Sequence, residues 1–251
     1  MPKDKIVLLD FDDTLNDPFV LLGQYSDRIA AGFVAEYGGD LREWAKAALD
    51  TLIVLEQEYL ERFTGNPRSG YCAWLEEVQR RSLEQIFGRM GLPAPENTLE
   101  RARSTQFEAL SLCNAAFPGA SEALTALSAA GYRLHMASGQ ESEYLRAALI
   151  GAQLNAFPER LYGPDLIDCA KEGPEYYRCL FADLGVPSGE VLIVDDQPAV
   201  IAWALEAGAA VLQSHLSPER RYPTVPGVAA SLTDLHALSD LVQRHHPLNQ
   251  V

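Results

Sequence analysis

The sequence has few basic residues for its size. Its 20 Lys and Arg stand against 35 Asp and Glu, which gives a formal net charge of −15 at pH 7. A protein that holds nucleic acid needs a basic surface against the phosphate backbone. The charge therefore predicts that nucleic acid is not a partner. A small anionic substrate still fits, because a metal ion and local donors can reverse the field at a site.

The sequence also lacks C-x-x-C pairs and long apolar runs. Its four cysteines, Cys72, Cys113, Cys169 and Cys179, are widely spaced, which favours reduced, packed thiols over a zinc site. No apolar stretch approaches the ~20 residues that span a bilayer. The first residues lead directly into a strand-like segment, with no room for a signal peptide. We therefore expect a cytoplasmic protein that does not bind a membrane.

What the sequence does contain is a series of short apolar runs, at residues 6–9, 134–137, 191–194 and 210–212. Such runs suit the central strands of a parallel sheet, which are buried on both faces. Helical patterns lie between them, with proline at the start and glycine past the end, as at Pro174 and Gly185. This alternation predicts an α/β fold with a doubly wound, Rossmann-like parallel sheet.

Residues 16–115 follow another pattern, with apolar residues at helical spacing and no convincing strand. This pattern predicts an all-helical cap domain over residues 16–115, inserted into a catalytic core of residues 1–15 and 116–251. Asn97 and Glu100 resemble a capping box at the start of the last cap helix. The Trp and Tyr residues of the helical stripes, Tyr59 among them, are expected in the cap core.

Polar residues follow three of the predicted strands. Residues 10–14 read Asp-Phe-Asp-Asp-Thr, residues 138–139 read Ser-Gly, and residues 195–196 are two aspartates. Ligands of such sheets bind outside the carboxyl ends of the strands. We therefore expect these groups to share one site, which Lys171 completes.

The residue types of this site favour phosphoryl transfer. Asp10 and Asp12 alternate in an extended segment and so face the same side. Two close carboxylates call for a cation, and Mg²⁺ fits best. One carboxylate can attack phosphorus while the other transfers protons. Lys171, the Ser138 hydroxyl and backbone N–H groups near Gly139 can bind the phosphoryl oxygens.

Taken in order, these motifs resemble those of the haloacid dehalogenase superfamily, in its phosphatase branch with a helical cap after the first strand. The matching stretches are IVLLDFDDTL, FPGASEALTALSAAGY, LHMASG, KEGPEYY and VLIVDDQPAVIAWALEAG. The resemblance covers roughly residues 1–15 and 116–213. It extends to the cap only as a helical insert in the same place.

The resemblance implies a role for each motif residue. Asp10 would be the nucleophile and Asp12 the general acid and base, while Thr14 would steady the motif loop. Ser138 and Lys171 would bind the phosphoryl group.

The resemblance also implies the metal ligands. Asp196 would bind Mg²⁺ together with the Asp10 carboxylate and the Asp12 backbone carbonyl. Asp195 is a further candidate ligand, at a position that is often glycine in the family. The sequence departs from the usual pattern at Val200 in place of an aspartate, Glu172 in place of a proline and Gln140 in place of an asparagine.

These features predict a Mg²⁺-dependent phosphatase that acts on a small phosphorylated metabolite through an aspartyl-phosphate on Asp10. A phosphomutase resembling β-phosphoglucomutase would use the same motifs, with a sugar hydroxyl in place of water as the acceptor. A non-catalytic binding protein on this fold would have lost a motif residue, and none is lost. Asp12 argues against the dehalogenase and phosphonatase branches, in which this aspartate is replaced. The substrate and the oligomeric state stay open.

Residues 63–71 contain two glycines and a proline between helical patterns, which is typical of a turn. Two interpretations stay open for it. It is either a plain surface turn or a loop that contacts the leaving group of the substrate. In the second case, Arg68 would pair with a second anionic group of the substrate.

Overall fold

The computed structural model describes residues 5–217, 220 and 222–248. Its centre is a six-stranded sheet of β1 (Ile6–Leu9), β2 (Arg133–Ala137), β3 (Arg160–Tyr162), β4 (Val191–Asp195), β5 (Ala210–Ser214) and β6 (Ala230–Leu232). The strand order is β3-β2-β1-β4-β5-β6, and neighbouring strands are parallel. The predicted α/β fold is confirmed, and the four apolar runs form the four central strands.

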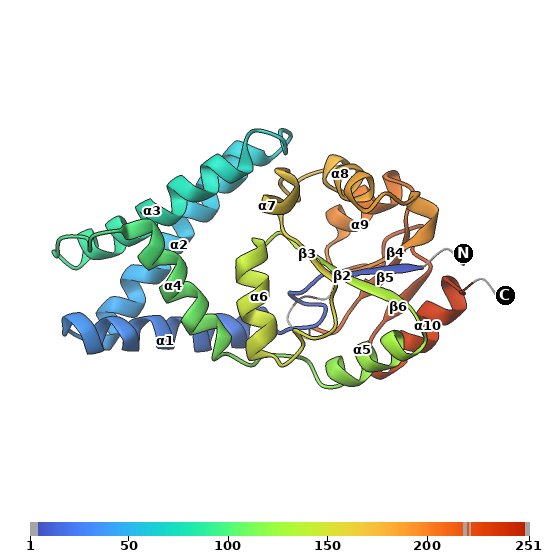
Figure 1. Ribbon diagram of the computed structural model, residues 1–251, viewed down its shortest axis with the longest axis horizontal. Coiled ribbons are helices and arrows are strands. Elements are labelled where there is room, and N and C mark those ends of the chain that lie inside the picture. The colour runs from blue at the N-terminus through green and yellow to red at the C-terminus, as the bar shows by residue number, and fades with distance from the viewer. Residues whose placement is uncertain (1–4, 218–219, 221, 249–251) are drawn as a thin grey trace.

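Helices cover both faces of the sheet (Figure 1). One face packs against α5 (Ala120–Ala129), α6 (Ser142–Gly151) and α10 (Leu238–His245), and the other against α8 (Pro174–Leu184) and α9 (Pro198–Glu206). Alternate strand residues enter the two cores, so that Val7 faces the first and Leu8 the second. This double burial explains why the central strands are mostly apolar. A short helix, α7 (Pro164–Ile167), follows β3.

The direction of winding changes beside β1. The chain passes from β1 to β2 and β3 on one side, then returns to β4 and β5 on the other. Ligands of doubly wound sheets bind at such a switch point, outside the carboxyl ends of the strands. The ends of β1 and β4 are therefore where the fold places a site.

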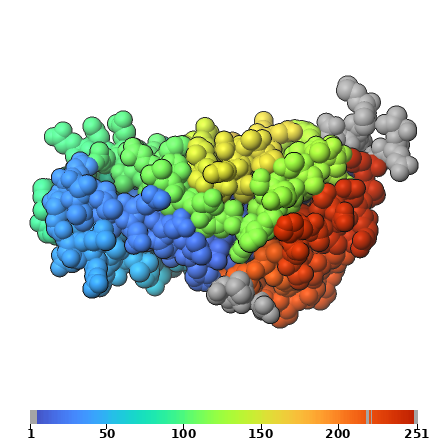
Figure 2. Space-filling model, turned by 90° about the horizontal axis from the view of Figure 1, so that it is seen from below, coloured from blue at the N-terminus to red at the C-terminus, as the bar shows by residue number. Residues whose placement is uncertain are grey.

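Four helices follow β1 and lie beside the sheet: α1 (Pro18–Tyr37), α2 (Leu41–Phe63), α3 (Tyr71–Arg89) and α4 (Thr98–Ser111). We call them the helical region; Figures 1 and 2 show it on the left, in blue to green. It has its own aromatic core, in which the Phe33 ring lies 4.8 Å from the Trp44 ring and 5.5 Å from the Phe87 ring. Within the described residues it contains helices and no named strand, as predicted for an inserted helical block.

Two chain segments join the helical region to the sheet, and they run side by side. The Asp17 N–H donates to the Ala115 carbonyl at 2.8 Å, and the Phe117 N–H donates to the Leu15 carbonyl at 2.9 Å. Asn16 forms bridges with both Asp12 and Ala116. The first of these segments is continuous with the Asp10–Asp12 motif, so the helical region is connected directly to the predicted site.

The capping box predicted at Asn97 is wrong. Asn97 does precede α4, but its φ is 56° and its side chain makes no capping hydrogen bond. In the left-handed conformation Asn97 cannot present its side chain as an extended cap residue does. Side-chain caps occur instead at α1 and α2, where Asp17 and Asp40 accept backbone N–H groups. In the described part of the chain no helix is long and apolar enough to cross a membrane.

Candidate active site

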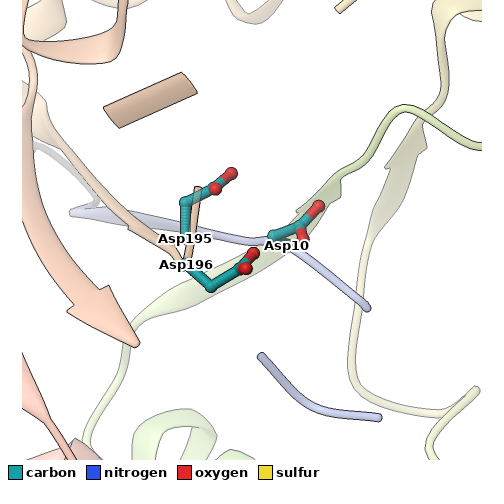
Figure 3. Close-up of side chains that lie close together, drawn as sticks. All are labelled: Asp10, Asp195 and Asp196. Atoms are coloured by element: carbon teal, nitrogen blue, oxygen red, sulfur yellow. The ribbon is translucent and has the colours of Figure 1, made fainter. Parts of the chain in front are cut away.

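Three aspartates meet where β1 and β4 end (Figure 3). β1 pairs with β4, and the Asp10 N–H continues the ladder to the Val194 carbonyl at 2.9 Å. Asp10 therefore leaves the sheet beside Asp195 and Asp196. One carboxylate oxygen of each lies within 4.8 Å of the others, and all three residues are buried. The convergence predicted from the strand ends is found in the structure.

Lys171 is the cation of this cluster. Its Nζ lies 2.8 Å from Asp10 Oδ1, 2.8 Å from Asp195 Oδ2 and 2.9 Å from the Ala137 carbonyl oxygen. All three ammonium protons thus have an acceptor. Burial lowers the pKa of Lys171, but the two carboxylates outweigh burial and raise that pKa well above its ordinary value. The ammonium therefore stays charged beside Asp10.

The cluster still carries more negative than positive charge. Asp196 Oδ2 is buried and has no hydrogen-bond partner among the described residues. Burial, with the charges of Asp10 and Asp195, raises the pKa of Asp196 to about 8. Burial also raises the pKa of Asp10 to about 7, although Lys171 acts to lower it. An unpartnered oxygen among three carboxylates suits a hard divalent cation such as Mg²⁺.

The two adjacent aspartates differ in their hydrogen bonds. Asp195 Oδ1 accepts the Gln197 N–H at 3.0 Å, and Asp195 Oδ2 accepts the Lys171 ammonium. Each oxygen of Asp195 therefore has a partner, whereas Asp196 has a free one. This difference favours Asp196 as the cation ligand and gives Asp195 the task of holding Lys171.

Asp12 lies on the turn that follows β1. Its Oδ1 accepts the Asn16 amide at 3.2 Å, and its Oδ2 is 3.5 Å from the Gln140 amide nitrogen. Burial raises the pKa of Asp12 to about 6, although both amides act to lower it. A carboxyl group of this pKa can give and take a proton near neutral pH.

The loop after β2 holds Ser138 and Gly139. The Ser138 N–H donates to the Tyr162 carbonyl at 3.1 Å, and the Ser138 hydroxyl oxygen accepts the Gln140 N–H at 3.2 Å. The hydroxyl of the fully buried Tyr176 donates to the carbonyls of Tyr162 and Ser138, at 2.6 and 3.2 Å. Tyr176 was not predicted as a site residue. The only signal for it in the sequence is its place in the KEGPEYY motif that contains Lys171.

A cavity of about 350 Å³ opens over these groups. Six of the predicted residues line it: Asp10, Asp12, Ser138, Gly139, Lys171 and Asp195. Asp196 lies beside them in the carboxylate cluster. A larger cavity of about 750 Å³ lies between α3, α4 and α6, and it contains none of these residues. The predicted site residues therefore lie at the smaller cavity and not at the larger one.

Helix α2 supplies part of the cavity wall that sequence reasoning missed. Glu56, Tyr59 and Leu60 line the cavity together with Glu172 and Gln197 of the core. Tyr59 was expected in the cap core; it does pack there against Phe63, but it is partly exposed and also faces the cavity.

Thr14, which was predicted to steady the motif loop, and Arg68, a candidate for substrate binding, both lie away from the cavity. Thr14 is fully buried, and its N–H donates to the Phe11 carbonyl at 3.4 Å within the motif turn. Arg68 has a side chain that is 64% exposed, and its Nη1 lies 3.1 Å from Glu175 Oε1 on α8. Neither is among the residues that line the cavity. The structure places the Arg68 guanidinium against Glu175 and outside the cavity.

The fold and the site together define a class of α/β hydrolases in which a strand-end aspartate lies beside a buried lysine. Residues 5–208 match the model of the family described as "haloacid dehalogenase-like hydrolase". The chain belongs to this family. It is 32% identical, over 124 residues, to the phosphoglycolate phosphatase of Rhodospirillum rubrum. That alignment covers 49% of this chain and 52% of the relative, so the match spans about half of each.

Solved structures share the whole fold at low sequence identity. The 2-haloacid dehalogenase of Pseudomonas syringae is 16% identical with a TM-score of 0.70, covering 96% of this chain and 99% of that one. A family hydrolase of Deinococcus radiodurans, with bound phosphate and sodium, is 23% identical with a TM-score of 0.55, and each chain is covered completely. At these identities the likeness concerns the fold alone.

Proposed function

We propose that the protein is a phosphatase that hydrolyses a small phosphate monoester with Asp10 as the nucleophile. The observation that carries the proposal is the cavity in which Lys171 Nζ lies 2.8 Å from Asp10 Oδ1, with the Asp12 carboxyl group in the same wall. The partial match to a phosphoglycolate phosphatase supports the reaction class. Residues 1–15 and 116–251 would be the catalytic core and residues 16–115 its cap.

The reaction would take place in two steps. First, an Asp10 oxygen attacks phosphorus, the ester P–O bond breaks, and Asp12 gives its proton to the departing alkoxide. Second, water attacks the aspartyl-phosphate while Asp12 takes a proton from it, which frees inorganic phosphate and Asp10. The Asp12 pKa of about 6 allows both directions of proton transfer. Lys171, the Ser138 hydroxyl and N–H groups near Gly139 would bind the phosphoryl oxygens.

Asp10 and Asp196 are the side chains that would hold Mg²⁺, with the Asp12 backbone carbonyl as a further oxygen. The unpartnered Asp196 oxygen supports this assignment, and the full set of partners at Asp195 makes it the weaker ligand. When bound, the ion would neutralise the carboxylates and the charge on the phosphoryl oxygens.

The test is the release of inorganic phosphate by the purified protein from p-nitrophenyl phosphate and from a panel of phosphorylated metabolites, with and without Mg²⁺. We expect Mg²⁺-dependent release with no isomeric sugar phosphate formed, which separates a phosphatase from a phosphomutase. We expect no release of halide from a haloacid, because the dehalogenases have another residue in place of Asp12. Absence of phosphate release from every substrate in Mg²⁺ would overturn the proposal.

A further inference from the structure

The cavity over Asp10 contains a single basic residue among the described residues that line it, Lys171. Its ammonium already donates to Asp10, Asp195 and the Ala137 carbonyl. The phosphoryl group would be the next anion to approach it. No cation in this lining is therefore left for a second anionic group on the substrate.

The wall supplied by α2 is acidic. Glu56 lies on the cavity side of this exposed helix segment, with Tyr59 and Leu60 beside it. From the core, the half-buried Glu172 lines the same cavity as Tyr59. Two carboxylates thus line the cavity, Glu56 from α2 and Glu172 from the core.

The two basic residues nearest in sequence to this wall are held elsewhere. Arg62 donates to the Ser69 carbonyl at 2.8 Å and lies over the Phe63 ring. Arg68 pairs with Glu175. Neither lines the cavity. The electrostatics of the wall thus come from Glu56 and Glu172.

We infer that the substrate is a phosphate monoester whose leaving alcohol carries an amino group, and that a leaving group with a second anion is disfavoured. A protonated amine offers three donors and a positive charge to Glu56 and Glu172. A carboxylate in its place would be repelled by both, with no fixed cation to offset the repulsion. This inference rests on the proposed phosphatase activity, and it separates this chain from its phosphoglycolate phosphatase relative.

The experiment uses three two-carbon esters that differ only at the far end: 2-aminoethyl phosphate, 2-hydroxyethyl phosphate and phosphoglycolate. With Mg²⁺ at pH 7.5, kcat/KM should fall in that order, with about tenfold or more between the amine and the carboxylate, as expected for unit charges at contact distance. Equal values, or a preference for phosphoglycolate, would overturn the inference. p-Nitrophenyl phosphate is assayed in parallel, because its hydrolysis shows that the proposed function holds even where the preference fails. Absence of any hydrolysis would overturn both.

A set of variants ties the preference to this wall. Glu56→Gln should lower the ratio of kcat/KM for the amine over the hydroxyl ester by about fivefold, and Glu56→Lys should raise the relative rate with phosphoglycolate. Glu61→Gln is the matched control, since Glu61 is exposed on the same helix and does not line the cavity. An equal change of the ratio in Glu56→Gln and Glu61→Gln, or none in either, would contradict the assignment.

Discussion

The Lys171 ammonium lies 2.8 Å from both Asp10 Oδ1 and Asp195 Oδ2, and so links the end of β1 to the end of β4. Removing one partner of a buried ion pair leaves the others unpaired, which typically costs 3–5 kcal/mol. Lys171→Met should therefore lower the free energy of unfolding by about 3 kcal/mol, measured by urea denaturation without Mg²⁺.

The control for this change is Lys46→Met. Lys46 pairs with Asp50 on the surface of α2, and its side chain is 74% exposed. Surface pairs contribute little, so we expect a loss below about 0.5 kcal/mol. Equal losses in the two variants would show that the buried pair has no special role.

The unpartnered Asp196 oxygen predicts that Mg²⁺ binds the folded protein in the absence of substrate. Mg²⁺ at millimolar concentration should raise the Tm of the wild-type protein, because a ligand of the folded state stabilises it. Asp196→Asn should abolish this rise, while Asp27→Asn, an exposed change on α1, should keep it. Catalytic activity should disappear in EDTA and return with Mg²⁺, and Ca²⁺ should restore it poorly. A full Mg²⁺ response in Asp196→Asn would show that the ion binds elsewhere.

Gly151 marks a close approach between α6 and the end of α4. A Cβ at this position would lie 2.0 Å from the Cys113 carbonyl oxygen. Gly151→Ala should therefore destabilise the protein by about 2 kcal/mol or more, measured by thermal unfolding. Gly88→Ala on α3 is the matched control, because nothing lies within 4 Å of its Cβ. There the better helix propensity of alanine should stabilise by about 0.5–1 kcal/mol. Equal effects at the two positions would contradict the packing described for Gly151.

His135 predicts a dependence of stability on pH. It is fully buried in β2, and burial lowers its pKa to about 4, whereas in the unfolded chain the value is near 6.5. The unfolded state therefore binds an extra proton between pH 6.5 and 4, so this contribution to stability is complete above pH 6.5 and is lost as the pH falls. The loss approaches about 1.4 kcal/mol per pH unit.

The contribution of His135 is isolated by difference, because the active-site carboxylates titrate with the opposite sign. Between pH 6.5 and 4 the wild type should lose more stability than His135→Leu, and as much as His236→Asn, whose side chain is 61% exposed in the folded protein. Parallel pH profiles for the wild type and His135→Leu would refute the assignment.

Much of the fold was predictable because the central strands are buried on both faces and can be recognised by their apolar residues. β1 is apolar throughout, and β2, β4 and β5 are mostly apolar, as expected of strands that are covered on both faces. β3 and β6 were missed because each has three residues and lies at an edge, where polar residues such as Arg160 interrupt the pattern. The capping box at Asn97 failed because a left-handed φ is not visible in the residue types.

The part of the site that lies at the strand ends was predictable from the sequence. The part that depends on how α2 packs against the core was not. Asp10, Ser138 and Asp195 meet because parallel strands end at one edge of the sheet. Glu56 lines the same cavity only because the fold brings α2 next to the core. No local spacing in the sequence encodes that placement. Arg68 was singled out by the composition of its turn, but Glu175, which is distant in sequence, holds its guanidinium.

The central claim is that Asp10 becomes phosphorylated, and the most direct measurement is to trap that intermediate. Wild-type protein would be mixed with labelled substrate, quenched in acid within one turnover, and digested for peptide mapping by mass spectrometry. We predict a hydroxylamine-labile phosphate on the peptide that contains Asp10. It should be absent in Asp10→Asn but still present in Asp12→Asn when the leaving group is good, because that variant loses only proton transfer. A label on any other residue, or equal labelling of the two variants, would contradict the account.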